Sequence, residues 1–315
     1  MAHRSSPIEW LVFGILGFVW GSSYLFIKIG VETLTPLTLV AGRVGIGAAV
    51  LAVAMLVARQ ALPRRAPVYG HLVVMALLGI VIPFFLITWG EQTIDSGLAA
   101  ILTGTVPLFA IVMAALVLAD EPITTNRLAG LVVGFVGVVL ITSPGLSGGM
   151  GGSMPGQLAL LGASVSYAAA GVYGRRMLQG VPAMTSAFGE VGFAFVISAA
   201  LALILEDPFA TQVEASTVLS LAWLGLTGSG LAFLAFFFLL NRWGATRTSL
   251  VAYLLPVVGV ILGVLVADEQ ISLPVLAGMV LIIGGVATAN LRFGQRRLLG
   301  RGPSVAPQKR TVPTD

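Results

Sequence analysis

Apolar residues dominate ten long segments of this 315-residue chain, and mostly short polar connections separate them. A bilayer core about 30 Å thick requires roughly 20 consecutive apolar residues in a helix. The pattern therefore predicts an all-α integral membrane protein with ten transmembrane helices. The expected helices cover residues 8–30, 36–58, 71–93, 97–118, 124–142, 157–178, 184–205, 217–241, 245–267 and 274–293.

The second half of the chain repeats the first in a diverged form. Ala119-Asp-Glu-Pro-Ile123 returns as Ala267-Asp-Glu-Gln-Ile271, 148 residues later, and the glycine and proline positions around it recur at nearly the same shift. A repeat of fixed period indicates a duplicated structural unit. We therefore divide the chain into a first repeat (1–142), an uncharged linker (143–156), a second repeat (157–293) and a basic tail (294–315) that we expect to be disordered.

The positive charges lie on one side of the predicted helices. Of the 17 lysines and arginines, only Lys28 and Arg43 lie well inside a predicted span. The other 15, in loops or at span ends, share one side when the spans alternate. The positive-inside rule then places both termini in the cytoplasm. Because each repeat has five spans, the second repeat must be inverted relative to the first. The net charge of +4 follows from this asymmetry and does not predict nucleic-acid binding.

The composition supports a membrane protein and narrows its chemistry. The chain is 57% hydrophobic and 10% charged, with a mean hydropathy of +1.00. Its 39 glycines are typical of closely packed transmembrane helices, and Gly130-x-x-x-Gly134 is one such packing face. The absence of cysteine excludes disulfides and cysteine-based metal sites. The sequence contains neither a P-loop nor a hydrolase set, so we expect no enzyme, no cofactor and no metal site.

Four predicted helices contain glycine or proline at a similar depth. Pro83 in the third span and Ser229 in the eighth, within a glycine-rich run, each lie about 18 Å from the start of the span. Pro107 and Pro256 lie at a comparable depth in the fourth and ninth spans. A proline removes a backbone hydrogen bond, so the freed carbonyl must find another partner. Paired interruptions are typical of the substrate sites of secondary transporters, although any single one is also typical of a packing kink.

One face of the first span carries Trp20, Tyr24 and Lys28, with Ser23 beside them. An aromatic and hydroxyl face at mid-depth would suit an amphipathic ligand, and packing in the core is the equally compatible alternative. Lys28 lies nearer the outer end, where we expect it to extend to the membrane surface. The residues that we assign to a midplane cavity are Trp20, Ser23, Tyr24, Pro83, Tyr167, Ser229 and Tyr253.

Arg43 and Glu190 occupy equivalent repeat positions inside the second and seventh spans and carry opposite charges. A charge inside the membrane is costly and by default indicates function. Arg43 lies about 10 Å from the outer face and Glu190 about as far from the inner face, so we expect them to serve opposite mouths of one pathway. Their expected neighbours are Glu91 for Arg43, and Arg175 or Arg176 for Glu190. A helix-anchoring hydrogen bond is the alternative, and the sequence leaves open whether Glu190 exchanges a proton.

The chain resembles the EamA family of the drug/metabolite transporter superfamily. The resemblance is carried by Trp20-Gly-Ser-Ser, by Arg43, and by the two segments that run from Pro107 to Glu121 and from Pro256 to Glu269. It covers residues 8 to 293 and implies two five-helix halves. It also implies that Glu121 and Glu269 are helix-end acids with a structural role.

The resemblance further implies a secondary transporter in a bacterial inner membrane that exports small organic solutes by alternating access. Amino acids such as threonine, methionine and the aromatic ones are the leading class. A broad-specificity drug or metabolite exporter is the alternative, and a nucleotide-sugar or phosphorylated-metabolite carrier is disfavoured because the spans contain only Lys28 and Arg43 as basic residues. The expected partners are the substrate, the lipid bilayer and, if transport is coupled, protons. The substrate, the coupling and the oligomeric state do not follow from the sequence.

Overall fold

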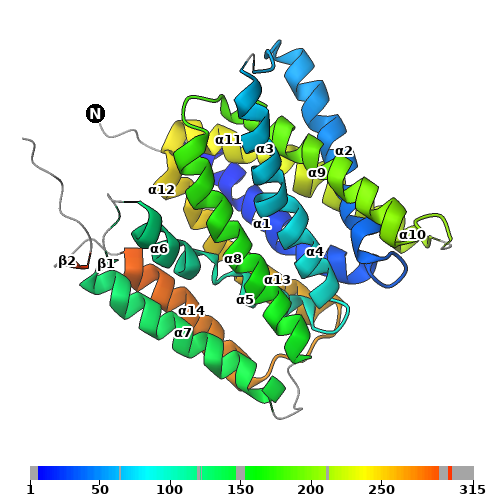
Figure 1. The fold of residues 1–315 in the computed structure, drawn as a ribbon. Coiled ribbons are helices and arrows are strands. Elements are labelled where there is room, and N and C mark those ends of the chain that lie inside the picture. The colour runs from blue at the N-terminus through cyan, green and yellow to red at the C-terminus, as the bar shows by residue number, and fades with distance from the viewer. Residues whose placement is uncertain are drawn as a thin grey trace, which may run out of the picture.

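The computed structural model describes residues 6–63, 65–118, 121, 123–146, 153–210, 213–290 and 297–299 as a bundle of long helices (Figure 1). Most of the predicted linker and tail, and Ala119, Asp120 and Pro122 of the first acidic segment, lie outside these residues. The first repeat contains α1 (Pro7–Gly30), α2 (Pro36–Val57), α3 (Ala66–Ala76), the π-helical η1 (Leu77–Val81), α4 (Ile82–Gly90), α5 (Ser96–Thr103), α6 (Val106–Val117) and α7 (Thr125–Leu146). The second contains α8 (Met154–Met177), α9 (Ala183–Leu205), α10 (Ala215–Ala222), the π-helical η2 (Trp223–Leu231), α11 (Ala232–Trp243), α12 (Ala245–Thr248), the 3-10 helix η3 (Ser249–Tyr253), α13 (Leu254–Val266) and α14 (Leu273–Asn290). Two short strands, β1 (Ile123–Thr124) and β2 (Arg297–Leu299), pair antiparallel.

Nine helical stretches of the described residues are long and apolar enough to cross a bilayer. They correspond to nine of the ten predicted spans, and the largest shift is in the third, which begins at Ala66. The protein is therefore an all-α, multi-pass membrane protein. The remaining long helix, α8, has 24 residues and matches the sixth predicted span. It is less apolar than the others because it contains polar residues such as Gln157, Ser164 and Ser166. These three are buried inside the bundle.

The first helix begins with two standard start signals. The Ser6 hydroxyl accepts from the Glu9 amide, the Glu9 carboxylate accepts from the Ser6 amide, and Pro7 occupies the first helical position. Glu9 also accepts a hydrogen bond of 2.8 Å from the indole of Trp243, so the start of α1 is fixed to the end of α11. The α11 end and the α1 start therefore lie at the same end of the bundle.

The four predicted interruptions are all present. η1 lies just before Pro83, and η2 contains Ser229. Between α5 and α6 the helix is broken at Gly104, three residues before Pro107, and η3 precedes Pro256. π and 3-10 segments alter the regular hydrogen-bond ladder and leave carbonyl groups available to other partners.

At three of these interruptions, a main-chain carbonyl receives a donor from another helix. The donors and acceptors are Ser166 Oγ to Leu78 O at 2.7 Å, Ser164 Oγ to Leu102 O at 3.2 Å, and Trp20 Nε1 to Gly228 O at 3.2 Å. At these positions the altered helix geometry therefore leaves carbonyl groups that accept hydrogen bonds from other helices. Partners for the carbonyls freed by the prolines themselves stay a prediction.

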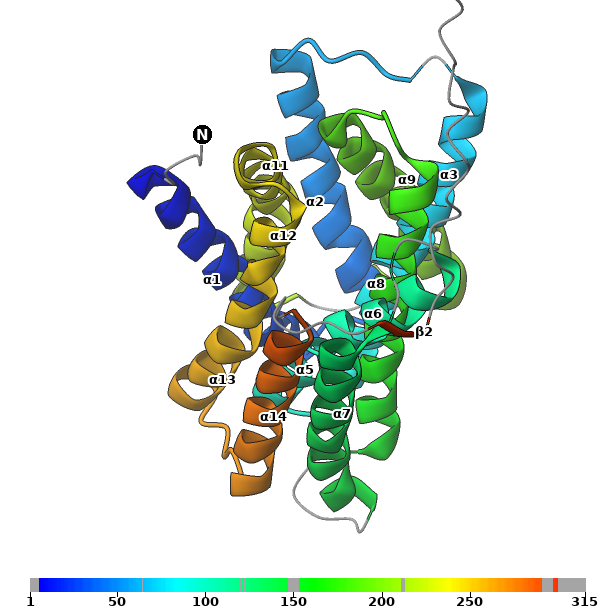
Figure 2. The same cartoon turned by 90° about the vertical axis from the view of Figure 1, so that its left-hand side faces the viewer.

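Equivalent helices of the two repeats pack against each other, α2 against α9 and α7 against α14 (Figure 2). On the second pair the backbones touch, because a Cβ added at Gly137 would lie 2.7 Å from the carbonyl oxygen of Gly278, and one at Gly285 would lie 2.6 Å from that of Gly130. These crossed contacts make α7 and α14 antiparallel. Glycine is required at this approach, as the small-residue pattern predicts.

The outer surface of the bundle is apolar. Leu116, Val57, Ile204 and Leu265 are all largely exposed, as lipid-facing residues should be. Inside the bundle, buried apolar clusters include residues of the interrupted helices, such as Ile80 and Leu224.

Candidate functional site

Arg43 is the central charge of the candidate site. It lies in the first half of α2, and only 4% of the residue is exposed. Its Nε donates to Ser229 Oγ at 3.2 Å, and its Cζ lies 4.0 Å from the centroid of the Phe84 ring. Within the described residues the guanidinium makes no further hydrogen bond and no ion pair. Its terminal amino groups are thus free to bind an anion.

The π-helical η2 brings Ser229 and Gly228 to Arg43. A Cβ added at Gly228 would lie 3.3 Å from Ser23 Oγ and 3.5 Å from Arg43 Nη2, so both groups border this glycine. The Gly228 carbonyl is the acceptor for Trp20 Nε1. The widened turn therefore presents a hydroxyl and a carbonyl group between α1 and α2.

The face predicted on α1 borders the same region. Trp20 packs its ring against Phe236 with centroids 5.6 Å apart, and Tyr24 is buried with 5% of its surface exposed. Tyr24 lies beside Thr103 and interacts electrostatically with Arg43. On α8, Tyr167 interacts electrostatically with both Tyr24 and Arg43. Two phenol groups therefore stand near the guanidinium.

Lys28 binds main-chain carbonyls outside its own helix. Its Nζ donates to the carbonyl oxygens of Glu91 and Ile94, both at 2.8 Å. The ammonium therefore fixes the connection between α4 and α5 at one end of the bundle, and the expected extension to the membrane surface stays a prediction. This partner is distant in the sequence, which is why the spacing along α1 could not identify it.

Glu91, at the end of α4, is completely buried. Neither of its carboxylate oxygens has a hydrogen-bond partner within the described residues, and the same holds for the hydroxyl of Thr88 one turn earlier. Glu91 interacts electrostatically with Lys28 and Arg43 without forming an ion pair with either. Arg43 and Glu91 therefore interact electrostatically, as expected, but they form no ion pair.

Glu269 closes the end of the bundle next to this region. Its carboxylate accepts from the Ser96 amide and hydroxyl, both at 2.7 Å, and from the Gly97 amide at 2.9 Å. It thus caps the N-terminus of α5 from the other repeat. Partial burial and the Glu269 carboxylate raise the pKa of Asp95, which precedes α5.

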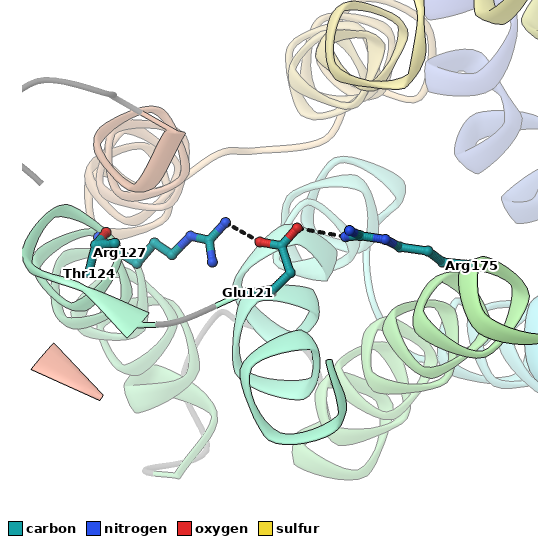
Figure 3. Close-up of polar contacts among 4 residues, drawn as sticks. All are labelled: Glu121, Thr124, Arg127 and Arg175. Atoms are coloured by element: carbon teal, nitrogen blue, oxygen red, sulfur yellow. Dashed lines mark hydrogen bonds and ion pairs between the residues drawn. The ribbon is translucent and has the colours of Figure 1, made fainter. Parts of the chain in front are cut away.

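Glu121, the repeat counterpart of Glu269, lies between two arginines (Figure 3). It accepts from Arg127 of α7 and, at 2.6 Å, from Arg175 of α8. Partial burial opposes ionisation of Glu121, but the hydrogen bonds from Arg175 and Arg127 outweigh it and lower its pKa. The Thr124 hydroxyl accepts from the Arg127 amide at 3.4 Å and begins α7.

Some predicted residues lie away from Arg43. Arg175 is bound by Glu121, so the expected pairing of Glu190 with Arg175 is wrong. Glu190, half-buried on α9, makes no hydrogen bond or ion pair with any described residue. The Tyr253 hydroxyl accepts from Asn290 of α14 at 3.1 Å, on the far side of the bundle. The contact with Arg43 is made by Phe84, the residue after Pro83, and not by Pro83 itself.

Sequence reasoning missed three residues that contact or face the site. They are Phe84 under the guanidinium, Gly228 between Ser23 and Arg43, and Thr88 beside Glu91. Phe84 and Gly228 lie within the two interrupted stretches, so their position near the midplane was a usable signal. Thr88 carried no such signal.

A pocket of about 670 Å³ lies between the end of α2, the start of α9 and α11. Its walls include Ala54, Val57, Met184, Phe237 and Asn241. Phe237 of the pocket wall and Phe84, which contacts Arg43, pack against the same apolar cluster. The pocket therefore approaches the site from the end opposite Lys28 and Glu269.

Comparison with known proteins identifies the chain as a membrane transporter. The EamA-like transporter family model matches residues 8–143 and again residues 154–291, so the chain belongs to this family. The uncharacterized inner membrane transporter YedA of Escherichia coli K12 is 31% identical over 82% of this chain and 82% of its own length. The uncharacterized transporter YoaV of Bacillus subtilis is 25% identical over 89% of this chain and 96% of its own. A solved crystal structure, 24% identical, covers 91% of this chain and 99% of its own with a TM-score of 0.66, which shows a shared fold.

Proposed function

We propose that this transporter exports amino acids from the cytoplasm through a cavity centred on Arg43. The observation that carries the proposal is a buried guanidinium with free amino groups, bordered by Ser229, Ser23 and aromatic rings. A guanidinium binds a carboxylate through two parallel hydrogen bonds, which are strong in a water-poor site. The rings of Trp20 and Phe84 supply apolar surface for a side chain.

The proposed architecture is ten spans in two inverted repeats, with α8 as the sixth span and both termini in the cytoplasm. Helices α7 and α14 hold equivalent repeat positions and run antiparallel, which supports inversion. The distribution of lysine and arginine supports the orientation. A bacterial inner membrane is the proposed location.

Alternating access is supported by the difference between the two ends of the bundle. At the proposed outer end, Glu269 caps α5, and Glu206 accepts from the Leu37 and Thr38 amides at the start of α2. At the proposed cytoplasmic end, the pocket approaches the cluster below Arg43. Rocking at the four interrupted helices would close this end and open the other.

A broad-specificity exporter is the second candidate. Phe233, Phe236 and Phe237 form a run of ring contacts beside Trp20, and such a surface would also accept apolar compounds. In that case the charge of Arg43 would contribute little to recognition.

The test is transport of labelled threonine, methionine and phenylalanine in proteoliposomes. We expect Arg43→Gln to reduce amino-acid transport by about tenfold or more, because a charge-assisted contact is lost, and Arg43→Lys to restore it only in part. Arg65→Gln, which removes an exposed charge, is the matched control. Normal amino-acid transport by a well-folded Arg43→Gln protein, with drug transport retained, would favour the second candidate. Repeating the assay with a proton gradient and Glu190→Gln tests the proposed use of protons.

A further inference from the structure

Three buried polar atoms at the end of α4 have no partner within the described residues. They are the two carboxylate oxygens of Glu91 and the hydroxyl of Thr88, and both residues are completely buried. Helical geometry continues through Glu91, so these residues, three apart, share one face. Buried polar groups are almost always hydrogen-bonded, and a cluster of exceptions indicates a group that the protein itself does not supply.

Lys28 does not supply that group. Its ammonium donates to the main-chain carbonyls of Glu91 and Ile94, and not to the Glu91 carboxylate. It therefore holds the backbone that carries Glu91 and leaves the carboxylate available.

Arg43 shows the same deficiency with the opposite charge. The residue is only 4% exposed, its terminal amino groups make no hydrogen bond to the described residues, and it interacts electrostatically with Glu91. Buried opposite charges near each other normally pair, because an unpaired one is costly. Tyr24 interacts electrostatically with both charges, and Tyr167 does so with Arg43, so the two phenols belong to the same polar group as Glu91 and Arg43.

We infer that Glu91 and Thr88 form an ammonium-binding subsite opposite Arg43, so that the transported solutes are zwitterions. The inference rests on the proposed function and makes it more specific. An ammonium group has three donors, and the subsite offers the two carboxylate oxygens and the Thr88 hydroxyl as acceptors. The carboxylate of the same molecule binds the Arg43 amino groups. The subsite selects compounds that carry both charges over hydroxy acids and amines of the same shape.

The experiment compares each of threonine, methionine and phenylalanine with its matching hydroxy acid and, for phenylalanine, with phenethylamine. Counterflow is measured in proteoliposomes without sodium or proton gradients. We expect the parental protein to prefer the amino acid by about tenfold or more. Glu91→Gln should abolish this preference by slowing the amino acid and leaving the hydroxy acid unchanged. Thr88→Val should weaken it by a smaller factor.

Two further variants separate binding from folding. Glu91→Asp keeps the charge and should retain the preference at a reduced rate, while Glu32→Gln, an exposed outer acid, should leave both rates unchanged. An unaltered preference in Glu91→Gln overturns the inference but not amino-acid export. If Glu91→Gln keeps that preference and loses only its response to an added proton or sodium gradient, the subsite holds that cation instead, and the inference is again overturned. If the parental protein moves no amino acid, the proposed function and the inference both fail.

Discussion

Glu121 and Glu269 occupy the same position in the two repeats, and each connects one repeat to the other, but they do so by different means. Glu269 accepts two backbone amides and a hydroxyl at the start of α5. Glu121 accepts from the long side chains of Arg127 and Arg175, the second of which is 49% exposed. One end of the bundle is therefore held by short contacts to the main chain, and the other by flexible, partly solvated charges.

The difference teaches that two residues at equivalent positions of a repeat need not make equivalent contacts in a single conformation. Under the proposed alternating access, the two ends of a transporter built from two similar halves differ in any one conformation, because one end is closed while the other is open. The pocket lies at the end held by the arginines, which agrees with this assignment. The implied structural role of both acids remains a prediction, and the experiments below test it.

The largest expected effect concerns which end faces which side of the membrane. In this cysteine-free chain, we expect Phe209→Cys, at an exposed position near the Glu269 end, to react with an impermeant maleimide in intact cells. Ala61→Cys, at the other end, should react only after permeabilisation. Labelling of Ala61→Cys from outside would reverse the assignment of the closed and open ends.

Loss of the main-chain contacts should have the next largest effect. We expect Glu269→Ala to lower the free energy of unfolding by about 2 to 4 kcal/mol, because the buried amides at the start of α5 lose their acceptor. Thermal unfolding in detergent measures the change. Asp207→Asn, at an exposed acid whose side chain makes no hydrogen bond to the described residues, should leave the transition unchanged. An equal loss in both variants would mean that Glu269 acts only through its charge.

The arginine-held end should be less sensitive. We expect Glu121→Gln to cost about 0.5 to 1.5 kcal/mol at neutral pH, since its partners are partly solvated. The pKa of Glu121 is lowered, so its contribution is complete above the ordinary glutamate pKa of about 4.3 and is lost as the pH falls through the lower value. The difference between parental and Glu121→Gln proteins should thus vanish at acidic pH.

The same unfolding measurement provides the control for Glu121. Arg176 is next to Arg175, but its side chain makes no hydrogen bond or ion pair with the described residues. Arg176→Gln should therefore unfold like the parental protein at every pH. A pH-independent difference for Glu121→Gln would contradict the ion-pair explanation and point to packing instead.

The sequence predicted the helical interruptions because their causes are local. Pro83 and the glycines around Ser229 alter the backbone within one or two turns, so their position along the chain was sufficient. The glycine spacing on α7 likewise indicated a close helix contact, but not that α14 would be the partner. These features depend on neighbours within a few residues.

The contacts of the charged residues were less predictable. The depth of Arg43 in its span drew attention to it, but its bond to Ser229 joins residues 186 positions apart. The two carbonyls bound by Lys28 are 63 and 66 positions away in the α4–α5 connection, and Arg175 is bound by a glutamate 54 positions away. Such partners depend on how each helix is rotated about its axis. These helices are apolar on all sides, so their sequences do not specify that rotation.

The composition of α8 affects how the chain enters the membrane during synthesis. Its buried serines and glutamine, and the arginines at its end, make it a poor substrate for insertion on hydrophobicity alone. Its main neighbours, α4 and α6, precede it in the chain and are already synthesised when it emerges from the ribosome. The carbonyl groups of Leu78 and Leu102 are then already present as acceptors for the hydroxyls of Ser166 and Ser164. The irregular turns of the first repeat therefore also prepare the place into which the second repeat begins to insert.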